Sequence, residues 1–363
     1  MHPRSRKIIM FSTAVSLALT TACAGKQGAV PAPQQTPSQM EQIKMQQAPS
    51  SDYRALDAQD KELPIVTIAG VKYVSARDLV DTLQYQSDWD AATKTLAIGD
   101  NDASYELVVD STKARKEDAE VVLANAPVLQ GDTAYLPVSA VADLFKEDMS
   151  YDISDDRMIV HATNDPVAER IDEDGVAPAE LDFADDPNDP FKGGDENAAE
   201  APAAVTDVPE ELPVTTPVSW QDEDAVPVIK NVDINALVRK GRQYMGVQYK
   251  FGTGSYAKTG YFDCSTFTGY VFGKFGINLP RTARAQARQG VWVSRKSLRK
   301  GDLMFFAVPG RFKSNKIVGH VGIYIGNGQM LHASPAPKNG VQISNINKAY
   351  WKKTFLTAKR VAF

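Results

Sequence analysis

The chain has 363 residues, with 40 basic and 45 acidic side chains and a formal net charge of −5. A chain of this length usually folds as about two domains. Its 43% of hydrophobic residues are enough for packed cores, while its 21 prolines and long polar stretches indicate that part of the chain lies outside them. The composition excludes a coiled coil, a collagen-like fibre and a multispan membrane protein.

The small net charge conceals a strong asymmetry along the sequence. Residues 229–363 contain 23 lysines and arginines but only Asp233, Asp263 and Asp302 as acids, which gives a net charge of +20. Residues 1–228 carry −25. This reversal predicts a domain boundary near residue 228. The two cysteines, Cys23 and Cys264, lie on either side of it and are too few for a disulfide framework.

The N-terminus has the layout of a signal peptide over residues 1–22. Basic residues precede an apolar run at 8–19, which is too short for a comfortable membrane span, and small residues then lead to Cys23. The string Leu-Thr-Thr-Ala-Cys at 19–23 resembles the lipobox of bacterial lipoproteins, apart from Thr20, and this resemblance implies a lipid anchor on Cys23. We expect an extracytoplasmic protein, anchored to the bacterial membrane or, as the alternative, secreted to the cell wall, with a flexible tether at 23–62.

Residues 63–162 contain an internal repeat with an offset of 62 residues. Tyr73 corresponds to Tyr135 and Trp89 to Tyr151. Each copy predicts two strands, a short amphipathic helix such as residues 76–83, and a further hairpin such as residues 87–98. The pattern resembles the copper amine oxidase N-terminal-like domain, which implies a small α+β stalk domain. Its one histidine, His161, is too few for a copper site, so we expect a spacer or binding module.

Residues 163–228 form an acidic, proline-rich stretch. Between 164 and 228 there are 19 acids, two bases and nine prolines, a composition that predicts a disordered linker. No EF-hand spacing is present. One further hypothesis is that this acidic linker folds back over the basic C-terminal domain and restrains it, and the alternative is that both are merely solvated.

The basic domain begins with a predicted amphipathic helix at 234–245 and a loop at 246–252. Cys264 then precedes an apolar helical stripe at 266–275. A cysteine at a helix N-terminus has its thiolate stabilised by the unpaired N–H groups there. Cys264 is therefore a candidate nucleophile.

His320 and His332 are predicted to lie on neighbouring strands, at 318–325 and 329–333. A three-residue loop at 326–328 would place both imidazoles on one face of the hairpin, whereas a two-residue Asn-Gly loop would separate them. With Cys264 this gives a nucleophile, a base and an orienting group. A Cys-His-His zinc site and an inert buried cysteine with two structural histidines remain as alternatives.

Several motifs in this domain resemble the NlpC-type family of papain-like cell-wall cysteine endopeptidases, over residues 236–361. They are Gln-Tyr-Lys-Phe-Gly at 248–252, Phe-Asp-Cys-Ser at 262–265, Gly-Ile-Asn-Leu-Pro-Arg-Thr at 276–282, Gly-Asp-Leu at 301–303, Gly-His-Val-Gly-Ile-Tyr-Ile-Gly-Asn-Gly at 319–328 and Leu-His-Ala-Ser at 331–334. The resemblance implies an α+β fold with helices packed on an antiparallel sheet. It also implies Cys264 as nucleophile, His320 as base and His332 as the third polar member.

The same resemblance implies that Tyr249, Asp263, Ser265 and Arg281 line the substrate pocket. Asp263 would meet the free amine of a peptidoglycan stem peptide and Arg281 a carboxylate. Thr253 and Ala283 depart from the family pattern and leave the specificity open.

The implied reaction is hydrolysis of a stem-peptide bond, γ-D-glutamyl to diaminopimelate or Lys, without metal or cofactor. A non-catalytic wall-binding lipoprotein and an amidase or acyltransferase on the same fold are the alternatives. The charge of +20 favours anionic wall polymers as further partners, because an exported protein with no nucleic-acid motif is not expected to bind nucleic acid.

Overall fold

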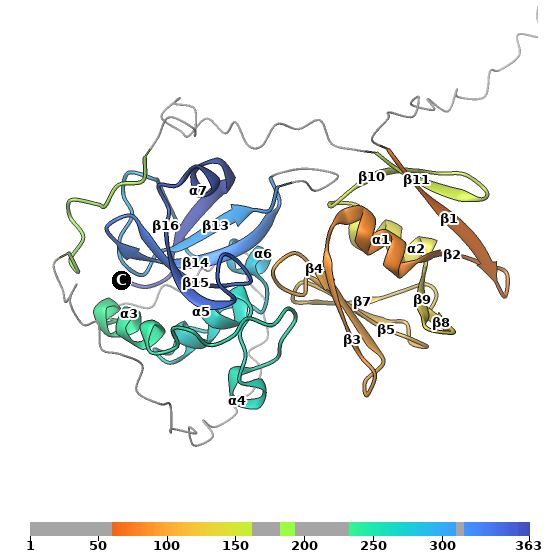
Figure 1. The fold of residues 1–363 in the computed structure, drawn as a ribbon, viewed down its shortest axis with the longest axis horizontal. Coiled ribbons are helices and arrows are strands. Elements are labelled where there is room, and N and C mark those ends of the chain that lie inside the picture. Colours follow the sequence, from red (N-terminus) through yellow and green to blue (C-terminus); the bar gives the residue numbers. More distant parts are fainter. Residues whose placement is uncertain (1–59, 162–181, 193–231, 310–315) are drawn as a thin grey trace, which may run out of the picture. The chain divides into compact units, whose positions relative to one another are not determined.

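The structure is a computed structural model that describes residues 60–161, 182–192, 232–309 and 316–363 (Figure 1). All of these residues belong to one compact unit of the chain, within residues 53–363. The signal peptide, Cys23, the tether up to residue 59 and most of the acidic linker lie outside the described residues. None of the helices that the structure describes has the length and hydropathy of a membrane span.

The N-terminal domain, residues 60–161, contains two antiparallel sheets. One has the strand order β10-β11-β1-β2-β9-β8 and the other the order β3-β4-β5-β6-β7. The strands of the first sheet are β1 (Lys61–Ile68), β2 (Val71–Ser75), β8 (Val128–Gln130), β9 (Thr133–Pro137), β10 (Ser150–Ile153) and β11 (Arg157–His161). Those of the second are β3 (Gln86–Asp90), β4 (Thr95–Gly99), β5 (Tyr105–Val108), β6 (Lys113–Lys116) and β7 (Ala119–Val122).

The internal repeat is visible in the two helices of this domain. Helices α1 (Ala76–Leu83) and α2 (Val138–Phe145) begin 62 residues apart and both pack against β2 and β9. Each follows a strand directly and buries leucines in a shared apolar core. The predicted helix at 76–83 is confirmed, and so is the hairpin, in which Ser87 pairs with Ile98. Strands β5 to β7 were not predicted.

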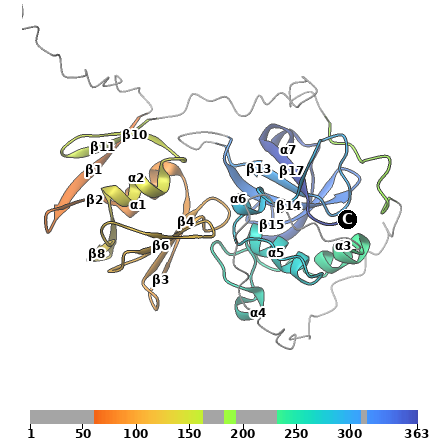
Figure 2. The same ribbon diagram turned by 180° about the vertical axis from the view of Figure 1, so that it is seen from behind.

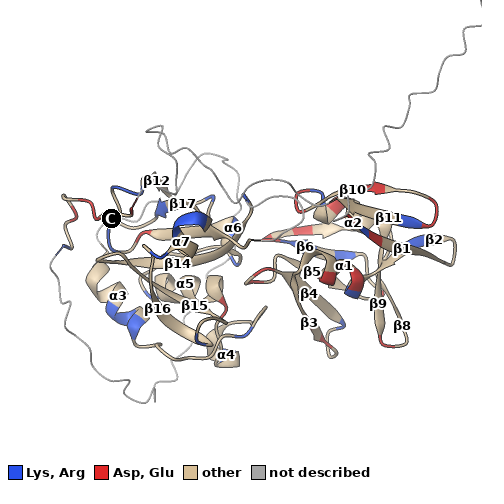
Figure 3. Cartoon of the chain, turned by 45° about the horizontal axis from the view of Figure 1, so that its top comes forward, with Lys and Arg blue, Asp and Glu red and all other residues tan. Residues whose placement is uncertain are grey.

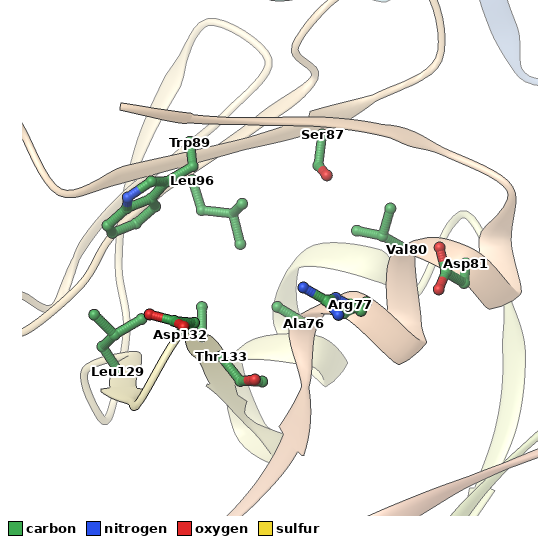
Figure 4. A pocket seen from close by; sticks show the side chains of 11 residues that line it. Ala76, Arg77, Val80, Asp81, Ser87, Trp89, Leu96, Leu129, Asp132 and Thr133 are labelled. Carbon is green, nitrogen blue, oxygen red and sulfur yellow. The ribbon is translucent and has the colours of Figure 1, made fainter. Parts of the chain in front are cut away.

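A groove of about 490 Å³ lies beside α1 in the N-terminal domain. Figure 4 shows Arg77 and Asp81 on the helix, facing Trp89, Leu129 and Asp132 across the groove. Trp89 is 39% exposed, and none of the described residues that line the groove is a cysteine or a histidine. The residues that line the groove therefore offer apolar, hydroxyl and charged side chains but no thiol or imidazole.

Part of the acidic stretch has a definite structure. Residues 182–192 lie along the C-terminal domain, where Phe183 is buried and Asp186 pairs with Arg299 at 2.8 Å. Asp185 accepts a hydrogen bond from Tyr324. The prediction of a disordered linker is wrong for these residues, because one aromatic side chain and several carboxylates find partners on the basic domain. The hypothesis that the stretch folds back holds for this segment.

The C-terminal domain, residues 232–363, is built on one antiparallel sheet with the order β12-β17-β13-β14-β15-β16. Its strands are β12 (Val291–Val293), β13 (Leu303–Ala307), β14 (Val318–Gly326), β15 (Gln329–Ser334), β16 (Gly340–Asn345) and β17 (Phe355–Arg360). Its helices are α3 (Ile234–Arg242), α4 (Tyr256–Thr259), α5 (Cys264–Gly273), α6 (Ala283–Gln286) and α7 (Ala349–Thr354). The α+β class and the helices packed on an antiparallel sheet agree with the prediction.

The two faces of this sheet bury different clusters. Helices α3 and α5 cover one face, and α7 covers the other (Figures 1 and 2). The first face contributes Leu303, Val321 and Leu331 to one core, and the second contributes Phe306 and Tyr324 to another. This alternation follows from the two-residue period of a strand.

The hairpin between β14 and β15 differs from the prediction at its tip. Gly326 pairs with Gln329, so the loop has two residues, Asn327 and Gly328, and both have positive φ, as in a type I′ turn. A register shift between Tyr324 and Gly326 adds one residue to β14. This bulge compensates for the shorter loop and restores the register that a three-residue loop at 326–328 would give, with Tyr324 opposite Met330.

Candidate active site

Cys264 is the first residue of α5. Asp263 is the N-cap, and its carboxylate accepts from the backbone N–H of Thr266 at 2.8 Å, while the Thr266 hydroxyl accepts from the Asp263 backbone N–H. This reciprocal capping box satisfies two otherwise unpaired donors and sets the helix start at one residue. The helix packs on β14 and β15. Local sequence therefore places the thiol at the N-terminal end of a helix, against the strands that carry both histidines.

The thiol of Cys264 is fully buried. Burial raises its pKa well above the ordinary value, and the nearby carboxylates of Asp102 and Asp263 raise it further. The backbone N–H of Val321, the residue after His320, donates to the sulfur and acts in the opposite direction. In this state the sulfur is held as a neutral thiol beside β14.

The two histidines lie together on neighbouring strands. Nε2 of His320 is 2.9 Å from Nδ1 of His332, and Nε2 of His332 is 2.9 Å from the hydroxyl of Ser344 on β16. Trp351 of α7 packs against both imidazoles, with ring centroids 5.6 Å and 5.3 Å away. The expectation that the two imidazoles share a face is confirmed, and Ser344 and Trp351 are members that sequence reasoning did not identify.

One ring nitrogen of this group is left open. Nδ1 of His320 is buried and has no hydrogen-bond partner among the residues that the structure describes. Burial lowers the pKa of His320 to about 3, and burial together with His320 lowers that of His332 well below its ordinary value. A neutral imidazole whose ring nitrogen has no partner can accept a proton there. In His320 that nitrogen is Nδ1, while His332 holds Nε2.

The hydrogen bonds do not favour the zinc alternative. A ligating histidine offers one ring nitrogen to the metal and uses the other to fix its orientation. Here both nitrogens of His332 are engaged, one with His320 and one with Ser344. His332 therefore has no ring nitrogen to offer a metal in this arrangement.

The predicted pocket residues Asp263, Ser265 and Arg281 form one hydrogen-bonded cluster at the start of α5, where Asp263 and Ser265 flank Cys264. Arg281 donates to Asp263 at 2.6 Å, to the hydroxyl of Ser265 at 3.0 Å and to the backbone oxygen of Thr253 at 3.0 Å. Burial raises the pKa of Asp263, while the Arg281 charge opposes that shift. The guanidinium is thus used within the protein, which differs from the expectation that it waits for a substrate carboxylate.

Tyr249 also lies beside the thiol, but its partners were not foreseen. Its hydroxyl donates to the backbone oxygen of Asn101 at 3.1 Å and accepts from Gln86 at 3.2 Å. Burial raises its pKa, with further contributions from Cys264 and Asp263. Asn101 and Asp102 lie between two strands of the N-terminal domain and have the composition of an ordinary turn, so no local signal in the sequence marks them as neighbours of the site.

The sequence matches two family models. Residues 246–360 match the NlpC/P60 family and residues 56–160 match the copper amine oxidase N-terminal domain. The murein DD-endopeptidase MepS/murein LD-carboxypeptidase of Escherichia coli K12 is 40% identical over 136 residues, which are 37% of this chain and 66% of that protein. The bifunctional muramidase/DL-endopeptidase CwlT of Bacillus subtilis is 35% identical over 145 residues, which are 40% of this chain and 42% of that one.

Among solved structures, an NLP/P60 family protein similar to a lipoprotein, from Staphylococcus aureus, is 28% identical. The match covers 39% of this chain and 45% of that one, with a TM-score of 0.33. The chain thus spans less than two thirds of the length of each of these relatives. The resemblance drawn from the motifs is confirmed: residues 246–360 belong to the NlpC/P60 family, and residues 56–160 are a copper amine oxidase N-terminal domain.

Proposed function

We propose that this chain is a cysteine endopeptidase that cleaves the stem peptides of peptidoglycan. The observation that carries the proposal is the relation of Cys264 to His320. The sulfur accepts the N–H of the residue next to this histidine, and the histidine has one open ring nitrogen and one fixed by His332. The names of the relatives, murein DD-endopeptidase and DL-endopeptidase, support the substrate class.

In the proposed reaction, Nδ1 of His320 takes the thiol proton and the sulfur of Cys264 forms a bond to the scissile carbonyl carbon. The tetrahedral intermediate collapses, the carbon–nitrogen bond breaks, and His320 returns the proton to the leaving amine. Water then hydrolyses the thioester. His332 holds His320 in the tautomer that these reaction steps require. No step needs a metal or a cofactor.

The bond that we propose is γ-D-glutamyl to diaminopimelate or Lys. Tyr249, Asp263 and Ser265 are the residues that line the substrate pocket in this proposal, and a free stem-peptide amine would pair with Asp263 by displacing Arg281 from it. Arg281 keeps a part in this proposal as the residue that orients Asp263 and Ser265. The relatives are named for different bonds, so the bond needs direct product analysis.

Further partners follow from charge and from the expected export. In Figure 3, lysine and arginine positions are blue on α3 and α7. The last turns of these helices carry Arg239 and Lys240 in α3 and Lys352 and Lys353 in α7. We propose that the basic residues of these two helices, on opposite faces of the domain, attract anionic wall polymers, with an affinity that falls as salt rises. A lipid on Cys23 would hold the enzyme at the outer side of the cytoplasmic membrane.

The test is digestion of purified peptidoglycan by the full chain, with mass analysis of the products. We expect new diaminopimelate or Lys amino termini from the parent and none from Cys264→Ala. Cys264→Ser is the matched variant, since it keeps the size of the side chain and weakens the nucleophile. Equal release by Cys264→Ala would contradict the proposal, and release of intact stem peptides from the sugar would identify an amidase instead.

A further inference from the structure

The connection between β4 and β5, residues 100–104, is a polar hairpin loop that is buried. Asp100, Asp102, Ala103 and Ser104 are each at most 3% exposed. Loops of such composition normally run over the surface, because their polar groups are satisfied by water. Here Ala103 belongs to the same apolar cluster as Cys264 and Phe262. The loop is therefore covered by the C-terminal domain.

The loop contacts the sulfur of Cys264. The backbone oxygen of Asn101 is 3.4 Å from Sγ, and a carboxylate oxygen of Asp102 is 3.9 Å from it. The same oxygen of Asp102 accepts the backbone N–H of Ala283 at 2.7 Å, and the Asn101 amide donates to the oxygen of Gly319 at 3.0 Å. The loop thus bonds to residues on several sides of the thiol.

These contacts occupy the space that a substrate needs. A carbonyl carbon under attack must come within about 3–3.5 Å of the nucleophile, along an open path. The backbone of Asn101 fills this position and accepts from the thiol that would otherwise give its proton to His320. Asp102 adds a negative charge beside the sulfur and raises the pKa of Cys264.

The loop is held by contacts outside the site. Arg284 of α6 donates to Asp148 and Tyr105 at 2.9 Å each, and it is 6% exposed. Asp118 accepts the backbone N–H of Arg281 at 2.8 Å, and Glu117 pairs with Arg288. The N-terminal domain therefore also bonds to the segment 281–288, which includes α6, the helix that packs against β14.

We propose that residues 100–104 are a built-in inhibitor of this chain, which covers the thiol until the N-terminal domain moves away. This inference rests on the proposed function of Cys264. The N-terminal domain is then more than a spacer, because its position decides whether the peptidase site is open. An event at the wall that draws this domain aside would release the activity at the place where it is needed.

The test measures how fast iodoacetamide alkylates Cys264 in the full chain with Cys23→Ser, so that one thiol reacts. Ala103→Arg puts a large charged side chain on the loop where it meets the C-terminal domain, and a Cβ added to Gly252 there would lie 3.6 Å from the Ala103 Cβ. Asn101→Gly with Asp102→Ala removes the anchoring side chains instead. Ala91→Arg, in the exposed turn at the other end of β4, is the matched control.

We expect both loop variants to be alkylated at least about tenfold faster than the parent, and Ala91→Arg to match the parent. Peptidoglycan hydrolysis should rise in parallel. Equal alkylation of the parent and both loop variants would overturn the proposal. It would also be overturned if the parent hydrolyses peptidoglycan and the loop variants are alkylated faster but hydrolyse it no faster. A third outcome separates the two proposals. If the loop variants are alkylated faster but neither they nor the parent release stem peptide, the loop does cover Cys264 and the proposed peptidase function is wrong. Circular dichroism checks that each variant is folded.

Discussion

His320 and His332 are joined by a hydrogen bond of 2.9 Å between Nε2 of the first and Nδ1 of the second. A second hydrogen bond extends this chain, because the hydroxyl of Ser344 lies 2.9 Å from Nε2 of His332. For Nδ1 of His320 to accept a proton, its Nε2 must carry the hydrogen and donate to His332. His332 then donates from Nε2 to the Ser344 hydroxyl. The three side chains thus fix one tautomer on both rings.

The first prediction concerns His332. Replacement by Ala removes the acceptor for the Nε2 hydrogen of His320, so the catalytic tautomer is no longer selected. We expect kcat for stem-peptide hydrolysis to fall by about 10²–10⁴-fold with little change in KM. His332→Asn keeps an oxygen that can accept this hydrogen, and we expect it to recover part of the loss. A kcat for His332→Ala within threefold of the parent would show that this residue has no orienting role.

The second prediction concerns stability in acid. Burial depresses the pKa of both histidines, that of His320 to about 3, so the folded state holds them neutral. The unfolded chain binds protons below about pH 6.5, and stability is therefore lost as pH falls through that value. We expect His320 to contribute about 2 kcal/mol of destabilisation between pH 7 and pH 5, and His332 to act in the same direction.

Urea unfolding at several pH values checks this, with His332→Gln compared with the parent. The variant should lose the part of the acid sensitivity that comes from His332. We compare the variant with the parent because His161 also titrates, and its contribution is the same in both proteins. Burial lowers the pKa of His161, but Asp60 and Asp152 raise it by more, so its effect on stability has the opposite pH dependence. Identical slopes for the two proteins would contradict the assignment.

Much of this site could be predicted because its signals are local. The N-cap preference of Asp263 and the helical stripe after it place Cys264, and strand alternation places His320 and His332 on one face. The prediction for the hairpin tip was wrong in loop length but correct in register, because a one-residue bulge in β14 offsets a loop that is one residue shorter. Sequence alone could not favour this pair of compensating changes over the simpler loop.

The residues around the thiol that come from the N-terminal domain could not be predicted. Asn101 and Asp102 look like any turn between two strands, and their burial depends on contacts with Cys264 and Ala283, which lie 163 and 181 positions away. Arg284 is similar, since it is one base among many in the sequence and yet is buried in an acidic and phenolic site. Such long-range pairings leave no trace in local composition or period.

The third prediction concerns Gly322, between His320 and Tyr324 on β14. A Cβ built there would lie 2.4 Å from the Met330 sulfur and 3.0 Å from the His332 Cβ. We expect Gly322→Ala to destabilise the protein by about 1–3 kcal/mol and to shift His332, with loss of activity. Met330→Ala in the same chain should restore part of the stability.

The matched control is Gly273→Ala at the end of α5, where an added Cβ meets nothing within 4 Å. There the better helix propensity of Ala should leave stability unchanged or raise it by up to about 1 kcal/mol. Chemical denaturation of the three variants measures the effects. A Gly322→Ala protein as stable as the parent would show that β15 gives way freely at this point.

The last prediction concerns Arg284, which joins the two domains. Its guanidinium donates to Asp148 and Tyr105 at 2.9 Å and to Tyr85 at 3.2 Å. Arg284→Ala leaves the buried carboxylate of Asp148 without its cation, and breaking such a pair typically costs about 3–5 kcal/mol. Arg284→Lys should not restore stability, because a single ammonium group cannot bridge three partners in different directions.

Lys94→Ala is the control for Arg284, since Lys94 and Asp110 form a pair whose side chains are 60% and 62% exposed. Its loss should cost less than about 1 kcal/mol. Urea unfolding followed by circular dichroism gives these values. We also expect one transition for the parent and two for Arg284→Ala, because this variant weakens the contact that couples the domains. A loss no larger than that of Lys94→Ala, in one transition, would mean that Arg284 does not hold the domains together.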